Sequence, residues 1–148
     1  MLVRRLGHRR WAAALGRRLV PFDQWLERSS GGRISIAWPL PRLRLTTIGR
    51  RTGVARTTPL LYARDGADWV VAASNWGQPH HPGWSANLIA NPDAAIQIGR
   101  EHVAVHATLA TGADRDRLWA ALTTVWPAYD TYAHRARREI RVFRLTSR

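Results

Sequence analysis

The sequence predicts a single α+β domain, a small β-barrel with helical additions, over most of its 148 residues. Two observations carry this prediction. Short runs with strand character follow one another through the middle of the chain, and Gly, Pro and Asp turn signals divide them. Helical periodicity lies apart from these runs. The hydrophobic fraction of 45% is normal for a globular protein, so we exclude disorder.

The first 30 residues are expected to form an amphipathic helical segment. Residues 2–19 show one helical stripe, since Trp11, Leu15 and Leu19 recur at four-residue spacing. Pro21 ends this helix and begins a short second one, which stops at Ser29-Ser30-Gly31-Gly32. We therefore divide the chain into a helical segment, residues 1–30, and one barrel domain, residues 31–148.

Seven strands are expected in the barrel domain. Asp65-Gly66 and Gly99 each mark a hairpin turn. Pro59 predicts a strand edge or an interruption, because proline cannot donate to the ladder. Residues 75–82 are expected to form a loop. The expected strands cover residues 33–38, 42–48, 54–64, 68–74, 94–98, 102–109 and 140–145.

Three helices are expected beside these strands. A short one covers residues 83–90 and is closed by Asn91-Pro92. Thr111-Gly112-Ala113-Asp114 is a capping box that begins a helix reaching residue 126. Pro127 begins the last one, which reaches residue 138.

The net charge is +13, and every basic residue is Arg. The planar guanidinium suits phosphate and carboxylate, so the charge indicates nucleic acid, an anionic membrane or an anionic cofactor. Codon bias is the alternative explanation for Arg in place of Lys, and the sequence favours the two about equally. No nucleic-acid-binding motif accompanies the charge, and we expect no such partner. The absence of Cys excludes disulfides and zinc–thiolate sites. No export signal or membrane-spanning run is found, which predicts a cytoplasmic protein.

The motifs of most self-sufficient enzymes are missing. The carboxylates are scattered, the His residues lack metal-ligand spacing, and there is no nucleophile elbow or phosphate loop. We expect no metal site. His102 and His106 should face solvent from one strand, and His80-His81 falls in a loop. If the protein is an enzyme, a cofactor should carry the difficult chemistry.

An anion site is predicted at the turn Gly49-Arg50-Arg51-Thr52-Gly53, which lies between two strands. The glycines allow a tight turn whose amides point the same way, and nearby Arg56 adds to its charge. A solvated basic turn is the alternative, and spacing alone favours the two about equally.

Further segments are suited to hold a planar ligand. Residues 72–75 end a strand in small and polar side chains, although an ordinary strand exit explains them too. The amides that begin the helix at Gly83 favour negative charge. Trp126, Tyr129 and Tyr132 share one helical face. Such a stripe is more often core than pocket rim, but the tyrosine hydroxyls favour a rim.

Together these segments resemble the deazaflavin-dependent nitroreductase family. The match runs from about residue 38 to residue 145, and the order of its segments makes it specific. Trp126-Pro127-Ala128-Tyr129 and Arg138-Glu139-Ile140 fit the family's C-terminal motif. The other segments that carry the resemblance are Leu45-Thr46-Thr47-Ile48-Gly49-Arg50-Arg51-Thr52-Gly53, Arg56, Thr58-Pro59-Leu60-Leu61-Tyr62, Ala72-Ala73-Ser74-Asn75, Pro82-Gly83-Trp84-Ser85-Ala86-Asn87-Leu88 and Ala90-Asn91-Pro92.

The resemblance implies a split β-barrel like that of flavin mononucleotide (FMN)-binding proteins. It also implies coenzyme F420, a deazaflavin with a phosphate and a polyglutamate tail. Family members pass hydride from the reduced cofactor to quinones, and adventitiously to nitroaromatic compounds. FMN on the same fold is the weaker alternative.

Site residues follow from the resemblance. Arg50, Arg51, Thr52 and Arg56 would meet the phosphate and the acidic tail. Ser74 would lie near the redox face, and Tyr129 would orient the acceptor or donate a proton to it. The implied catalytic residues are Tyr129, Ser74 and Tyr132, and Trp126, Tyr129 and Tyr132 would border the substrate. The implied cofactor-binding residues are Arg50, Arg51, Thr52, Arg56, Thr57, Thr58, Pro59, Leu60, Leu61, Tyr62, Ala72, Ala73, Ser74, Asn75, Gly83, Trp84, Ser85, Ala86, Asn87 and Tyr129.

Three positions depart from the family pattern. Asn75 stands where some relatives carry Lys, and Arg141 replaces the usual Pro of the last strand. Trp126 stands where a nitro-reducing member has Tyr, which favours quinone over nitro reduction. Residues 2–28 carry Arg on one face and Trp11 and Trp25 on the other. This segment should either pack on the barrel or contact the inner face of the membrane. Oligomeric state is not predicted.

Overall fold

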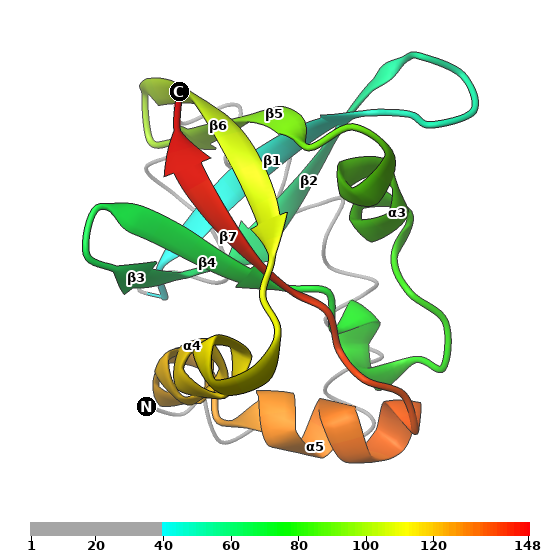
Figure 1. Cartoon of the computed structure of the whole chain (residues 1–148), viewed down its shortest axis with the longest axis vertical. Coiled ribbons are helices and arrows are strands. Elements are labelled where there is room, and N and C mark those ends of the chain that lie inside the picture. The colour runs from blue at the N-terminus through cyan, green and yellow to red at the C-terminus, as the bar shows by residue number, and fades with distance from the viewer. Residues whose placement is uncertain (1–39) are drawn as a thin grey trace.

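The computed structural model describes residues 40–148, so the helical segment expected before residue 30 and the strand expected at 33–38 lie outside the described part. Seven antiparallel strands form one sheet in the order β2-β1-β5-β6-β7-β4-β3. Figure 1 shows that the sheet is curled, with α4 and α5 together at one end and α3 beside β1 and β2. The strands are β1 (Arg42–Ile48), β2 (Ala55–Leu61), β3 (Ala63–Asp65), β4 (Asp68–Ala72), β5 (Asp93–Ile98), β6 (Glu101–Leu109) and β7 (Val142–Ser147). The helices are the 3-10 turn η1 (Asn75–Gly77), α3 (Gly83–Ala90), α4 (Gly112–Val125) and α5 (Ala128–Ala136).

Most of the expected elements are confirmed. β1 and α3 have the predicted bounds, and the β5–β6 hairpin agrees to within one residue at each end, with Gly99 at a φ of 59° in its turn. β2 is the edge strand that Pro59 predicts, since it is paired only with β1 in the described sheet. The expected loop at 75–82 also contains η1, which the sequence did not indicate.

Three strand predictions are wrong in their bounds. The expected strand 68–74 is shorter, since β4 ends at Ala72. The expected strand 54–64 is divided at Tyr62, because β2 pairs with β1 whereas β3 pairs with β4. The Tyr62 N–H still donates to the Pro41 carbonyl at 3.2 Å, in register with the β1–β2 pairing, and β3 begins at the next residue. The last strand begins at Val142, not at 140, since the Ile140 carbonyl accepts instead from Arg115 Nη2.

The capping box is also wrong. Thr111 precedes α4 but makes no side-chain capping bond. The Asp114 carboxylate is occupied elsewhere, because it accepts from Arg117 Nη2 at 2.9 Å and from Arg144 Nη2 at 3.0 Å. The same two arginines hold Asp65, so that charged groups tie α4 to β3 and β7.

The core has two parts, one on each face of the sheet. Leu43, Leu45 and Phe143 belong to the part that includes Leu88 of α3. The other part lies under α4 and α5, where Leu118 and Leu122 are fully buried. Gly77 brings η1 close to α5, since a Cβ at this position would lie 3.1 Å from Tyr132 Cα. The structure thus holds α3 against β1 and η1 against α5.

Within residues 40–148, no helix is long and apolar enough to span a bilayer. The same part of the chain holds no group of three or more His, Asp or Glu that could bind a metal ion.

Candidate functional site

A groove of about 620 Å³ lies between the β1–β2 turn, the segment after β4 and the start of α3. Its volume is in the range of cofactor and ligand pockets. Nine of the predicted cofactor-binding residues line it: Arg50, Arg51, Thr52, Arg56, Thr58, Asn75, Gly83, Trp84 and Asn87. The fold therefore brings together the arginine turn and the helix start, which are separated by about 30 residues of sequence.

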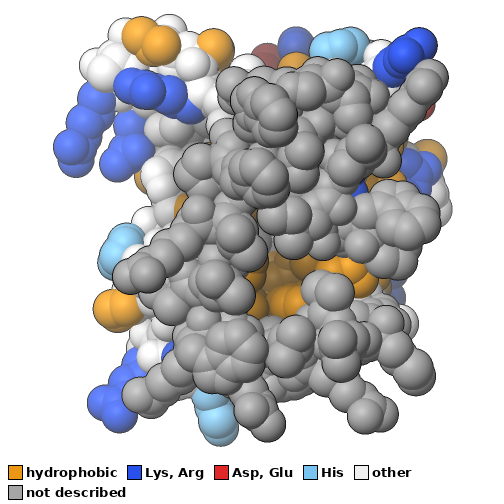
Figure 2. Space-filling view, turned by 180° about the vertical axis from the view of Figure 1, so that it is seen from behind, with side chains coloured by type: hydrophobic (Ala, Val, Ile, Leu, Met, Phe, Trp, Pro, Cys, Tyr) orange, Lys and Arg blue, Asp and Glu red, His pale blue; other side chains and the backbone are white. Residues whose placement is uncertain are grey.

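The β1–β2 turn is held by its own backbone. The Gly49 N–H donates to the Val54 carbonyl and the Gly53 N–H to the Gly49 carbonyl, both at 2.8 Å. Gly53 has a φ of 70°, a conformation that favours glycine. These amides are used inside the protein, so side-chain charge carries more of the anion-binding capacity of the turn than the sequence suggested. Figure 2 shows basic side chains projecting at this corner of the molecule.

Asn87 fastens the turn to α3. Its Oδ1 accepts from the backbone N–H and from Nη1 of Arg50, both at 3.1 Å, and its Nδ2 donates to Thr47 Oγ1 at 3.2 Å. Asn87 is only 6% exposed and Thr47 is fully buried. Arg50 is thereby held against α3, and it is exposed along the groove like Arg51 and Arg56.

The Arg138 guanidinium organises the wall of the groove that the segment after β4 forms. It donates to the carbonyls of Ala73 (3.2 Å), Ser74 (3.3 Å), Gln78 (3.3 Å) and His80 (3.1 Å). Arg138 Nη1 also lies 3.1 Å from His81 Nδ1. Burial lowers the pKa of Arg138, and nearby Arg141 lowers it further. The sequence placed Arg138 in a family motif but gave no signal of this role, since its partners lie about 60 residues earlier.

His80 and His81 line the groove, although the sequence placed them only in a loop. Arg138 can only donate, so Nδ1 of His81 accepts and the proton of the neutral ring lies on Nε2. Burial lowers the pKa of His81, and Arg141 and Arg138 add to this effect. His102 and His106 are exposed on β6, as predicted.

Other predicted cofactor-binding residues do not line the groove. Thr57 alternates with Arg56 and Thr58 along β2, and its Oγ1 lies 2.8 Å from Thr46 Oγ1. Ala72 and Ala73 are buried, one in each core. The remaining members of this set are Pro59, Leu60, Leu61, Tyr62, Ser74, Ser85, Ala86 and Tyr129. Their contact with a cofactor stays a prediction.

The aromatic stripe is packed in the core under α4 and α5. Trp126, Tyr129 and Tyr132 are 6%, 4% and 1% exposed, and Trp126 Nε1 donates to the Tyr132 hydroxyl at 3.3 Å. The rings of Tyr129 and Tyr132 meet edge to face, with centroids 6.2 Å apart. Burial raises the pKa of Tyr129, and Tyr132 adds to this effect, so its hydroxyl stays protonated. Substrate contact by these residues stays a prediction.

Comparison with known proteins identifies the family of this chain. Residues 20–147 match the protein family described as F420H(2)-dependent quinone reductase. The F420H(2)-dependent quinone reductase Rv1261c of Mycobacterium tuberculosis is 38% identical over 139 residues, which cover 90% of this chain and 93% of the relative.

Solved structures agree on the fold. An F420-H2 dependent reductase (FDR-A) superposes with a TM-score of 0.67 at 30% identity, over 72% of this chain and 94% of that one. A structure described as a domain-swapped dimer superposes with a TM-score of 0.68 at 27% identity, over 85% of this chain and 99% of that one. The curled antiparallel sheet with its helices is thus the split β-barrel that the sequence predicted. The chain belongs to the F420H(2)-dependent quinone reductase family.

Proposed function

We propose that this protein is an oxidoreductase that uses reduced coenzyme F420 to deliver a hydride to a quinone or a similar electron-poor acceptor. The observation that carries the proposal is the groove, in which cationic and aromatic residues from three separate segments meet in a member of this family. The named relatives are described as F420H(2)-dependent reductases. The barrel domain that forms the groove is proposed to span residues 31–148.

The groove suits a long ligand with a flat ring and an acidic tail. At the β1–β2 turn, Arg51 and Arg56 are exposed and offer charged donors to phosphate and carboxylate groups. In the same groove, Trp84 offers an aromatic face, and Asn75 and His80 offer polar groups. The positive turn is therefore assigned to the phosphate and tail, and Trp84 with the polar groups to the ring.

The chain's own residues position the reaction. Bound in its reduced form, the cofactor supplies the hydride that the side chains cannot. Arg138 fixes the segment that includes Ser74 and His81, and so sets the distance between this wall and α3. Because its pKa is raised, Tyr129 is suited to orient an acceptor oxygen by a hydrogen bond more than to release a proton. Tyr132 and Trp126 are proposed to support Tyr129 at the acceptor side.

The proposed activity is tested by following the oxidation of reduced F420 by absorbance, anaerobically, with and without a soluble quinone. Quinone-dependent oxidation in proportion to enzyme concentration is the expected result. A matched assay with reduced FMN tests the alternative cofactor, and a nitroaromatic acceptor tests the second substrate class. Quinone reduction should exceed nitro reduction. Failure to oxidise reduced F420 with any acceptor would contradict the proposal.

A cytoplasmic enzyme at the inner face of the membrane is the finer proposal. The basic and aromatic faces predicted for residues 2–28 support it, because a lipid-soluble quinone resides in the bilayer. Sedimentation with anionic and neutral liposomes tests it, and replacing Arg4, Arg5, Arg9 and Arg10 with Gln should reduce binding to the anionic ones. A filter-binding assay at physiological salt should detect no specific nucleic-acid binding.

A further inference from the structure

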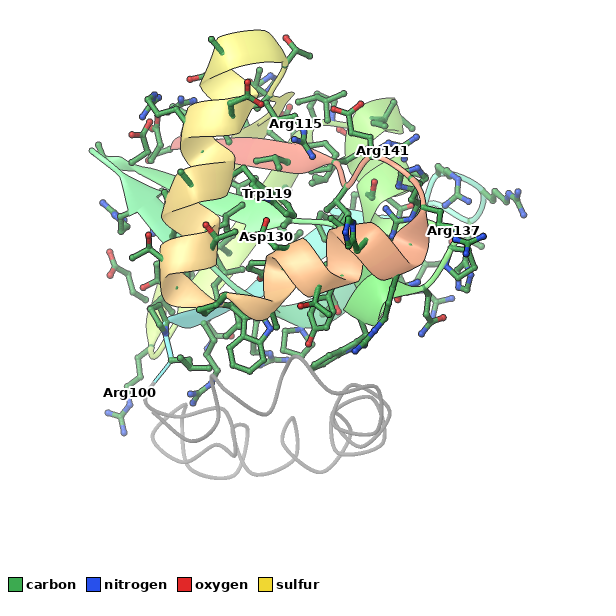
Figure 3. All side chains as sticks on the ribbon, turned by 90° about the horizontal axis from the view of Figure 1, so that it is seen from below. Arg100, Arg115, Trp119, Asp130, Arg137 and Arg141 are labelled. Carbon is green, nitrogen blue, oxygen red and sulfur yellow. The ribbon has the colours of Figure 1, made fainter. Side chains whose placement is uncertain are left out.

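A second cavity, of about 310 Å³, lies beside the groove between the end of β6, the first turn of α4 and the α5–β7 connection. His81 lines both cavities, whereas Arg115, Glu139 and Arg141 line only the second. Figure 3 shows Arg115 and Arg141 near each other where α4 approaches β7, with Arg100 on the opposite side of the domain. A group that entered the second cavity would therefore lie next to a ligand in the groove.

The charge of the second cavity is positive. Its carboxylate, that of Glu139, lies 3.0 Å from Arg115 Nε and is 77% exposed. Arg115 is further held by its bond to the Ile140 carbonyl. Glu139 is thus balanced by Arg115, and Arg141 remains as the surplus positive charge of this cavity.

Arg141 is fixed in place without being neutralised. Its Nη1 donates to Ser85 Oγ at 3.1 Å, and Ser85 is fully buried. No ion pair joins Arg141 to a carboxylate among residues 40–148. A neutral partner orients the guanidinium but leaves its charge available to a ligand.

The other polar groups of this cavity also favour an anionic group that accepts hydrogen bonds. Arg138 makes the neutral His81 ring a donor at Nε2. Thr111 lies at the positive end of α4 and makes no side-chain capping bond there. The lining therefore combines positively charged donors, a neutral donor and the positive end of a helix.

We propose that this cavity is a subsite for the anionic substituent of the hydride acceptor, and that Arg141 is the residue that selects for it. The acceptor would be a quinone that carries a carboxylate or sulfonate, with its ring in the groove beside His81 and its charged group against Arg141. The volume of about 310 Å³ is at the lower end of ligand pockets, and suits a ring substituent better than a second cofactor. The proposal rests on the proposed function for the identity of the acceptor.

Two quinones with the same ring system test the subsite in the full-length protein. Menadione is neutral, and 1,4-naphthoquinone-2-sulfonate is anionic. Arg141→Gln should raise the KM for the sulfonate about tenfold, as expected for one charge-assisted hydrogen bond, and leave the KM for menadione and the affinity for F420 within about twofold. The matched control is Arg100→Gln, in the exposed β5–β6 turn, which should change neither KM.

Binding without cofactor gives a second measurement. Calorimetry should show that the sulfonated quinone binds the wild type about tenfold more tightly than the Arg141→Gln variant, and that added salt weakens this binding. Arg141→Lys, which keeps the charge, should retain most of the preference. If Arg141→Gln does not fold, this Lys variant and the salt dependence of the wild type decide the question.

The subsite would be overturned if Arg141→Gln raised the KM equally for both quinones. It would also be overturned if binding of the sulfonate did not change with salt or with substitution of Arg141. Inorganic sulfate that binds as tightly as the sulfonated quinone would also overturn it, because the site would then take any small anion. If the wild type reduces neither quinone, the proposed function fails, and the calorimetry still decides whether the cavity binds the anionic group.

Discussion

Replacing Arg138 with Met should loosen one wall of the groove and lower the free energy of unfolding by about 2–3 kcal/mol. The Arg138 guanidinium lies within hydrogen-bond distance of four carbonyls and of His81 Nδ1. Hydrogen bonds from a charged donor contribute about 1.5–3 kcal/mol each. The total free energy lost is smaller than that of four such bonds. Nη2 has only two hydrogens for three carbonyls, and exposed carbonyls form hydrogen bonds to water once the guanidinium is gone. We therefore count one to two bonds, chiefly that to buried Ala73.

Thermal unfolding followed by tryptophan fluorescence measures this loss. For a chain of 148 residues, 2–3 kcal/mol corresponds to a fall in Tm of about 4–12 °C. The matched control is Arg137→Met, since Arg137 is adjacent in sequence but exposed. A second measurement is F420 affinity, which should fall in Arg138→Met because His80 and Asn75 line the groove. Arg138→Lys should recover part of both losses.

Equal stability of Arg138→Met and the wild type, to within about 0.5 kcal/mol, would refute the account of this wall. Lower stability with unchanged F420 affinity would show that the Arg138 bonds stabilise the fold but do not shape the groove.

Three further predictions concern the tail end, the acceptor side and the charged network. Arg56→Ala should weaken F420 binding about 10- to 100-fold, the equivalent of ~1.5–3 kcal/mol. The loss should be smaller for cofactor that lacks the glutamate tail. Fluorescence titration measures both affinities, with Arg100→Ala as the control. Tyr129→Phe should lower turnover at least about tenfold and leave F420 affinity nearly unchanged, and a fully active variant would exclude this role. Arg117 and, to a lesser degree, Arg144 hold the pKa of Asp65 well below its usual range. Asp65 therefore stabilises the fold above the unfolded-state pKa, about 3.9, and this contribution is lost as the pH falls through the lower folded-state pKa. Acid unfolding of Asp65→Asn should accordingly depend less on pH below about 4 than that of the wild type or of Asp116→Asn, and an equal pH dependence would contradict the network.

Local patterns predicted the elements well where neighbouring residues decide them. β1 follows from its strand character between turn signals, α3 from the spacing between Gly83 and Asn91-Pro92, and the β5–β6 turn from Gly99. The division of the strand at Tyr62 depends on which partner strand each half meets, so no local pattern could predict it. The same holds for Asp114, whose carboxylate is drawn from the helix cap by distant Arg144.

The site was predictable where charge and turn chemistry are local, as at Arg50, Arg51 and Arg56. The parts of the site that long-range contacts assemble were not predictable. His80 and His81 lacked a metal or catalytic spacing, and nothing near Arg138 in sequence indicated five partners in the loop after β4. The aromatic stripe was ambiguous in the sequence, because helical periodicity favoured core packing whereas the tyrosine hydroxyls favoured a pocket rim. The structure shows Trp126, Tyr129 and Tyr132 buried in the core.

The most direct test of the central claim is a side-by-side titration of the full-length protein with F420 and with FMN, followed by quenching of its eight tryptophans. Trp84 lines the groove, so a ligand bound there should quench its emission. The account predicts saturable quenching by F420 at lower concentration than by FMN, and a loss of this difference in Arg56→Ala. Tighter binding of FMN, or F420 binding that does not respond to Arg56, would contradict it.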